Sequence, residues 1–286
     1  MSWRIGPTST RTYDPTQYLG SAPHYRGGRP RYSPQLEATL VRELGLDGRG
    51  RLLDVGCGPG ILTTRLAGYF EETVGLDPDG DMLAEGEKAA AAEGLGNIVW
   101  IKATAENLPI AAPGPFRLIT FGQSFHRMDE LPVARAVYDM LERGGAVALI
   151  AHSVDGRPRP PNPGHPPIPH DELRALVLSY LGSLERNGLG FAGVRDHTWQ
   201  DILVQTRFGE VEEVWAPGIP DLLRDTDSVI SGYLSMSWSA PHLYGDRLEE
   251  FVAEARALLE ERSPDGLFWD WPGDTAIVIG RKKASA

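Results

Sequence analysis

The stretch of this sequence best suited to hold a ligand is the run of small residues from Asp54 to Gly60. It reads Asp-Val-Gly-Cys-Gly-Pro-Gly, with a buried-strand pattern before it and a helical pattern after it. A glycine turn at such a junction brings bare backbone close to a bound molecule, because glycine has no side chain to keep that molecule away. Pro59 fits near the first turn of the following helix. The stretch therefore predicts a pocket for a nucleotide or a nucleoside.

The spacing of the glycines restricts the ligand. A dinucleotide-binding turn has the order G-x-G-x-x-G, in which the third glycine allows the helix to pack closely. Here the third glycine, Gly60, comes one position early, and the branched Ile61 stands where glycine is needed. A phosphate-binding P-loop needs Gly-Lys-Ser or Gly-Lys-Thr, which the sequence lacks. Both interpretations as a phosphate-binding turn are therefore weakened.

Apolar strand patterns and amphipathic helix patterns alternate through the middle of the chain. Strands are expected near 52–55, 73–77, 98–101, 117–121 and 146–150, with helices at about 60–70, 79–94 and 130–142 between them. This alternation predicts a mainly parallel sheet covered on both faces. Ligands of such sheets bind beyond the carboxyl ends of the strands. Asp77 and the segment 122–126 come at two of these ends.

The flanking segments have other patterns. Residues 1–32 are rich in Gly, Pro, Tyr and Arg and are expected to form a loosely structured arm, and an amphipathic helix should follow at 33–45. Beyond residue 152 the expected elements are a proline-rich loop at 158–169, helices near 171–186 and 198–206, a strand near 208–215, a helical insertion at 220–262 and a last strand at 275–280. These patterns divide the chain into an arm and helix at 1–45, an α/β core at 46–152, a loop and cap at 153–207, and strands completing the sheet at 208–286.

Four motifs, in this order, resemble those of the class I S-adenosylmethionine-dependent methyltransferases. They are the glycine turn, Asp77 at a strand end, Ala-Glu-Asn-Leu-Pro at 105–109 and Gly-Gln-Ser-Phe-His at 122–126. The chain is most similar to the small-molecule group that includes type 11 and trans-aconitate-methyltransferase-like enzymes, over about residues 50–151. The resemblance implies a Rossmann-like, doubly wound α/β fold. Its mostly parallel sheet would have seven strands with the last antiparallel, plus an N-terminal helical arm and helical cap insertions.

The same resemblance implies S-adenosylmethionine as cofactor and S-adenosylhomocysteine as product. Asp54 would lie near the cofactor's ammonium, and the Asp77 carboxylate would accept hydrogen bonds from both ribose hydroxyls. Met82 would pack on the adenine, whose edge the Ala105 N–H and the Glu106 carboxylate would read. The full predicted set is Tyr25, Arg29, Asp54, Gly56, Cys57, Gly58, Gly60, Asp77, Pro78, Met82, Ala105, Glu106 and Gln123.

Methyl transfer from a sulfonium needs positioning above all, and a base only where the acceptor begins protonated. His126 is the first candidate for a base or an orienting group, because imidazole titrates near neutral pH, and His152 is the second. A structural role remains an alternative for His126. The only cysteine, Cys57, is interpreted as a small side chain filling the turn. No metal site is expected at His165 and His170, because no carboxylates or cysteines cluster with them.

Composition restricts the partners. A net charge of −11 argues against a nucleic-acid partner, because nucleic-acid binders present a basic face to the phosphates. There is no apolar run typical of a signal peptide or a membrane span, so a cytoplasmic protein without a membrane partner is expected. The expected partner is a small-molecule methyl acceptor; its identity and the oligomeric state stay open. Two other classes are kept as alternatives: a non-catalytic protein that binds S-adenosylmethionine and, more weakly, a nicotinamide dehydrogenase.

Overall fold

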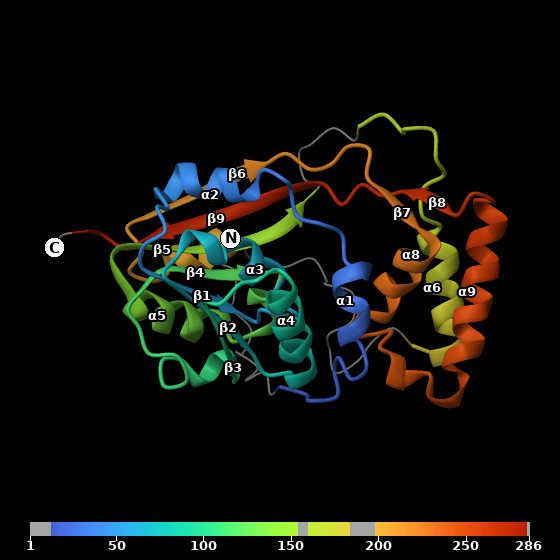
Figure 1. The fold of residues 1–286 in the computed structure, drawn as a ribbon, viewed down its shortest axis with the longest axis horizontal. Helices are drawn as coiled ribbons and strands as arrows, with labels where there is room; N and C mark the ends of the chain where they lie inside the picture. The colour runs from blue at the N-terminus through green and yellow to red at the C-terminus, as the bar shows by residue number, and fades with distance from the viewer. Residues whose placement is uncertain (1–12, 154–159, 184–197, 285–286) are drawn as a thin grey trace, which may run out of the picture.

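A seven-stranded sheet forms the core of the computed structural model, which describes residues 13–153, 160–183 and 198–284 (Figure 1). The strand order is β3-β2-β1-β4-β5-β9-β6. These strands are β1 (Arg51–Val55), β2 (Glu72–Asp77), β3 (Ile98–Lys102), β4 (Phe116–Gly122), β5 (Leu141–Ser153), β6 (Glu210–Ala216) and β9 (Asp274–Arg281). β1 to β5 run parallel to one another, and β9 runs antiparallel to both β5 and β6. The doubly wound α/β sheet with an antiparallel last strand is confirmed.

Helices cover both faces of this sheet. Successive strand residues point to opposite faces, and the central strands are apolar on both: Leu53 belongs to one core cluster and Leu52 to the other. The first cluster packs under α5 (Glu130–Met140) and α7 (Trp199–Val204), and the second under α2 (Leu36–Leu44) and α3 (Ile61–Leu66). The helix α4 (Gly80–Ala92) follows β2. Short 3-10 segments occur at η1 (Ala67–Tyr69), η2 (Ala105–Asn107), η3 (Phe125–Arg127), η4 (Pro241–Leu243) and η5 (Gly245–Arg247).

A separate hydrophobic cluster forms a cap beside the sheet (Figure 1). It contains α6 (His170–Leu181), α8 (Thr226–Leu234), α9 (Leu248–Arg262) and a two-stranded sheet of β7 (Leu223–Asp225) and β8 (Leu267–Trp269). Two expectations are wrong here. The helix expected at 171–186 ends at Leu181, because Gly182 takes up a left-handed conformation with φ 71°. The insertion at 220–262 is not helical throughout, since its first part pairs with β8 as β7.

The arm is more ordered than its composition suggested. Residues 22–28 form the helix α1 (Ala22–Gly28), which lies between the core and the cap (Figure 1). A Cβ on Gly28 would lie 2.3 Å from the backbone carbon of Ser231, so α1 and α8 touch backbone to backbone. Arg224 donates to the Gly28 carbonyl and forms an ion pair with Asp270 at 3.2 Å. Contacts distant in sequence therefore stabilise a helix too short to be stable alone.

None of the helices in the described ranges is both long and apolar enough to cross a membrane.

Candidate functional site

The turn between β1 and α3 needs its glycines for three different reasons. Gly56, Gly58 and Gly60 all have positive φ values, of 64°, 54° and 70°. A Cβ on Gly56 would lie 2.6 Å from the Ser124 Cβ, and one on Gly60 would lie 2.4 Å from the Trp100 ring. At Gly58, by contrast, the nearest atom to such a Cβ is 4.0 Å away, on Tyr25. Gly58 is therefore the glycine that leaves open space at which a ligand can meet the backbone.

Asp54 places a buried carboxyl group beneath this turn. Its side chain is enclosed at the end of β1, with the residue 1% exposed. One carboxyl oxygen accepts from the Thr63 hydroxyl at 2.7 Å and the other from the Thr120 hydroxyl at 2.8 Å. Burial raises the pKa of Asp54 to about 6, against the opposing effect of these hydrogen bonds. In the described part of the chain, the hydrogen bonds of this carboxyl include no cationic partner, so a positively charged ligand group would stabilise its ionised form.

Asp77 supplies a second buried carboxyl at the end of β2. Its oxygens accept from the Gly58 N–H at 2.8 Å and from the Asp79 N–H at 2.9 Å. Burial raises the pKa of Asp77 to about 6. Since each carboxylate oxygen has two lone pairs, both can accept one further hydrogen bond. Asp79 is instead the N-terminal cap of α4, accepting from the N–H groups of Asp81 and Met82.

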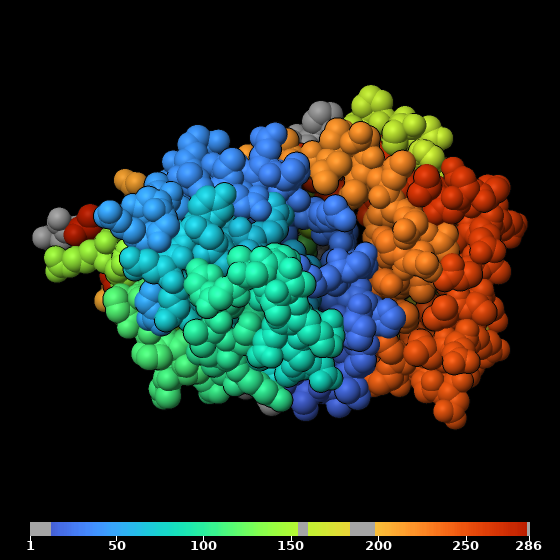
Figure 2. Space-filling model, in the orientation of Figure 1, coloured from blue at the N-terminus to red at the C-terminus, as the bar shows by residue number. Residues whose placement is uncertain are grey.

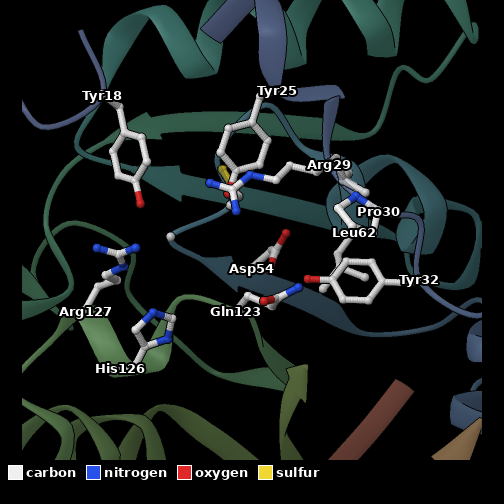
Figure 3. Close-up of a pocket in the computed structure, with 14 residues that line it drawn as sticks. Tyr18, Tyr25, Arg29, Pro30, Tyr32, Asp54, Leu62, Gln123, His126 and Arg127 are labelled. Carbon is white, nitrogen blue, oxygen red and sulfur yellow. The ribbon is translucent and has the colours of Figure 1, made fainter. Parts of the chain in front are cut away.

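An open pocket lies between the arm and the carboxyl edge of the sheet (Figure 3). Figure 2 shows the surface hollowed beside the arm, between the core and the cap. Seven of the predicted residues line the pocket: Tyr25, Arg29, Asp54, Gly56, Cys57, Gln123 and His126. The other predicted cofactor residues are outside this lining: Gly58, Gly60, Asp77, Pro78, Met82, Ala105 and Glu106. Of the last three, Met82 and Ala105 are buried, whereas Glu106 is exposed on η2.

Arg29 brings an incompletely bonded guanidinium to the pocket. One terminal nitrogen donates to the Ser235 carbonyl at 2.7 Å, and the guanidinium lies 4.7 Å from the centre of the Tyr25 ring. Its Nε is buried and has no hydrogen-bond partner among the residues that the structure describes. A buried donor without an acceptor is costly. The arginine is therefore suited to an anionic group entering the pocket.

Gln123 has an unusual backbone conformation. Its φ of 53° is the only positive value at a non-glycine position in the described segments. Its N–H donates to the Ile150 carbonyl at 2.8 Å, and its side chain hydrogen-bonds with the Tyr32 hydroxyl. A backbone held in this sparsely populated region is found most often at functional sites. The end of β4 is thus held in a strained conformation next to the pocket.

The two candidate histidines differ in position. His126, on η3, lines the pocket. His152, at the end of β5, is outside the lining and stacks on the Tyr32 ring with centroids 4.9 Å apart. Its Nε2 lies 3.3 Å from the Pro30 carbonyl, and burial lowers the pKa of its imidazole. The structure therefore brings His126 to the pocket and packs His152 behind Tyr32.

Several lining residues were missed in the sequence. The aromatic and basic ones are Tyr18, Tyr32 and Arg127, and the apolar ones include Ile61 and Leu62. Tyr32 belongs to the tyrosine- and arginine-rich stretch that marked the arm, so a signal for it existed. Tyr18 belongs to the same arm, whereas Arg127 lies just outside the motif at 122–126. Cys57 is buried and burial raises the pKa of its thiol, consistent with a side chain that fills the turn.

Comparison with known proteins places this geometry in a family. Residues 52–145 match the model of the methyltransferase domain family. They form a class I methyltransferase domain. The matches support the class and do not single out the trans-aconitate-methyltransferase-like group.

Curated relatives of the methyltransferase domain resemble about half of the chain or less. The chain is 30% identical over 141 residues to a malonyl-[acyl-carrier protein] O-methyltransferase of Enterobacter lignolyticus, covering 48% of this chain and 53% of that protein. It is 28% identical over 138 residues to the probable S-adenosylmethionine-dependent methyltransferase CRG1 of Saccharomyces cerevisiae, covering 47% of each. The chain spans about half the length of these relatives.

Solved structures extend the likeness in fold beyond the methyltransferase domain. The [4+2]-cyclase SpnF superposes with a TM-score of 0.54 at 18% identity, covering 97% of this chain and all of that chain. The YcgJ protein of Bacillus subtilis superposes with a TM-score of 0.50 at 19% identity, covering 87% of this chain and 98% of that chain. At these identities the likeness shows the fold alone.

Proposed function

We propose that this protein transfers a methyl group from S-adenosylmethionine to an oxygen, nitrogen or carbon atom of a small molecule. The observation that carries the proposal is the pair of buried carboxyls, Asp54 and Asp77, on either side of the open backbone at Gly58. They lie at the carboxyl ends of adjacent parallel strands of the methyltransferase domain. Ligands of open α/β sheets bind at this edge.

The residues present fit the cofactor. Its amino-acid end carries one ammonium and one carboxylate, and the pocket offers the buried carboxyl of Asp54 and the unmatched Nε of Arg29. The remaining acceptor positions of Asp77 suit the two ribose hydroxyls. Ala105 and Glu106 would contact the adenine edge, with Met82 against the ring. The open side of Gly58 leaves room for the cofactor to lie against the backbone.

When bound, the cofactor would supply a methyl group already activated by the positive sulfur. The chain's own work is to hold the acceptor in line with that methyl group and to exclude water. His126 lies on the pocket wall beyond Gln123 (Figure 3), which makes it the first candidate to orient the acceptor or take up its proton. His152 would act through its packing against Tyr32 rather than from the pocket wall.

A second candidate function is binding of the cofactor without methyl transfer. SpnF, which shares the fold, is named a [4+2]-cyclase, so the fold alone does not require methyl transfer. The presence of a histidine in the pocket and the names of the sequence relatives favour catalysis.

Isothermal titration of the protein with S-adenosylmethionine and S-adenosylhomocysteine tests the cofactor, and labelled S-adenosylmethionine offered with a panel of acceptors tests transfer. We expect both ligands to bind and the label to move to an acceptor. Once an acceptor is found, His126→Ala should slow transfer while the Kd of the cofactor is unchanged. Binding without transfer to any acceptor would favour the binding protein. No binding at millimolar ligand would refute both functions.

The affinity for S-adenosylhomocysteine should rise with pH between pH 5 and pH 7. Asp54 and Asp77 both have pKa values of about 6, so they lose their protons across this window and gain charge that the ligand's ammonium and hydroxyls stabilise. The rise should approach about tenfold per pH unit for each carboxyl that must ionise, and level off above pH 7. Isothermal titration at four pH values measures it. An affinity independent of pH would mean that neither carboxyl contacts the ligand.

Better folding cannot produce this rise. Carboxyls whose pKa values are raised in the folded state bind more protons there than in the unfolded chain. Their contribution to stability is therefore complete below about pH 4 and is lost as the pH rises through 6. The stability contributed by these groups falls while the affinity rises. An Asp54→Asn variant is the matched control, and its affinity should have a shallower pH dependence than that of the wild type.

A further inference from the structure

A second arginine faces the pocket and has no anionic partner in the described ranges of the chain. Arg127 lies on η3 beside His126, half-buried, and lines the pocket (Figure 3). Its guanidinium lies 5.7 Å from the centre of the Tyr18 ring. Within the described residues, the guanidinium makes no hydrogen bond or ion pair. A guanidinium offers five donors in a planar fork that matches a carboxylate, so Arg127 is available to bind one.

The two arginines stand at opposite ends of a row of aromatic rings. Arg29 lies over Tyr25, Tyr25 meets Tyr18 edge to face with centroids 6.4 Å apart, and Arg127 lies over Tyr18. The pocket thus holds two guanidinium groups, each against a different tyrosine ring.

The charge of the pocket is opposite to that of the chain. The chain carries a net charge of −11, yet the pocket lining holds two arginines and a single acid, Asp54. Both oxygens of that acid already accept from threonine hydroxyls, and neither bonds to an arginine. An anion entering the pocket would therefore be attracted to its arginines.

The cofactor has groups for only one of these arginines. Its single carboxylate matches the unmatched Nε of Arg29, and its ammonium matches Asp54. The Arg127 guanidinium then has no partner on the cofactor, and the remaining occupant of a methyltransferase pocket is the methyl acceptor. The rest of the lining combines the aromatic and aliphatic side chains of Tyr18, Tyr25, Tyr32, Ile61 and Leu62 with polar groups such as Gln123 and His126.

We infer that the methyl acceptor is a carboxylate with an aromatic or alkyl body, and that Arg127 holds its carboxylate group. This inference rests on the proposed function. It makes Arg127 a specificity residue. An acceptor whose carboxylate is replaced by a neutral amide would leave the guanidinium without its charged partner and lose the charge-assisted hydrogen bonds. Selection would therefore depend on the acceptor's charge as well as its shape.

Ligand-observed NMR titrations of the complex with S-adenosylhomocysteine test the inference. The probes are benzoate, phenylacetate and hexanoate, each paired with its own amide. We expect at least one carboxylate to bind the complex, and to bind about tenfold or more tightly than its amide. Arg127→Gln should weaken that carboxylate's binding about 10- to 100-fold, as loss of a charged hydrogen-bond pair does, and leave the Kd of S-adenosylhomocysteine within about twofold. The affinity of Arg127→Lys for the carboxylate should lie between those of the wild type and Arg127→Gln, because lysine keeps the positive charge but lacks the planar fork of donors.

Arg135→Gln is the matched control, because Arg135 is exposed on α5 and outside the pocket lining. It should change neither affinity. Three results would overturn the inference: no carboxylate binds better than its amide, Arg127→Gln leaves carboxylate binding unchanged, or Arg127→Gln weakens S-adenosylhomocysteine as strongly as the carboxylate. The last would assign Arg127 to the cofactor. Failure of the wild-type protein to bind S-adenosylhomocysteine would instead refute the proposed function, and this inference with it.

Discussion

Asp77→Ala is expected to weaken the binding of S-adenosylhomocysteine by about 100-fold while the protein stays folded. The Asp77 carboxylate uses one lone pair of each oxygen within the protein, on the N–H groups of Gly58 and Asp79. Its other lone pairs would accept from the ribose hydroxyls. Hydrogen bonds to a charged group contribute about 1.5–3 kcal/mol each, so the loss of two corresponds to about two orders of magnitude or more in Kd. Isothermal titration at pH 8, where the carboxyl is ionised, measures the change.

The 2′-deoxy analogue of S-adenosylhomocysteine separates a ribose contact from a shift of the turn. The wild-type protein should prefer the natural ligand about tenfold, and Asp77→Ala should bind both equally weakly. Asp81→Asn is the control, because Asp81 is exposed in the first turn of α4 and should change neither affinity. Thermal unfolding of each variant shows that the fold is intact. If Asp77→Ala still discriminates between the two ligands as the wild type does, Asp77 does not contact the ribose.

Local patterns were enough to predict the core and the frame of the site. β1 and β4 are apolar on both faces, as expected for strands of a parallel sheet covered on both faces. The positive φ values of the turn need glycine, so Gly56, Gly58 and Gly60 appear in the sequence as a turn. Asp79 caps α4 through backbone N–H groups only two and three residues away. Each of these features depends on neighbours in the chain.

Features set by distant contacts were not predictable. The helix α1 owes its order to α8, about 200 residues later, and the strand β7 to β8. The role of each glycine could not be predicted either, since Trp100 lies within β3 and Ser124 follows β4. The position of Arg127 in the pocket could not be predicted from local patterns either. Its place opposite Tyr18 follows from the path of the arm over the sheet, and no local pattern encodes that path.

Gly60→Ala should lower the free energy of unfolding by about 3 kcal/mol, which is more than the same substitution should cost at Gly58. The new Cβ would lie 2.4 Å from the Trp100 ring, at a residue whose φ is 70°. Trp100 cannot retreat easily, because its ring also lies within 2.8 Å of where Cβ atoms would stand on Gly75 and Gly86. Urea unfolding followed by circular dichroism measures the loss.

Gly58→Ala is the matched comparison. Both positions require a left-handed backbone, but only a Cβ on residue 60 would clash with an aromatic ring. It should cost only about 1–2 kcal/mol of stability, from the unfavourable φ, since its Cβ has no neighbour closer than 4.0 Å. The same Cβ would project into the space assigned to the cofactor, so Gly58→Ala should lose affinity for S-adenosylhomocysteine. Replacing Trp100 by Leu in the Gly60→Ala background should recover part of the lost stability. Equal losses of stability in the two alanine variants would show that contact with Trp100 is not the reason for glycine at residue 60. Unchanged affinity of Gly58→Ala for the cofactor would show that the cofactor does not lie against this turn.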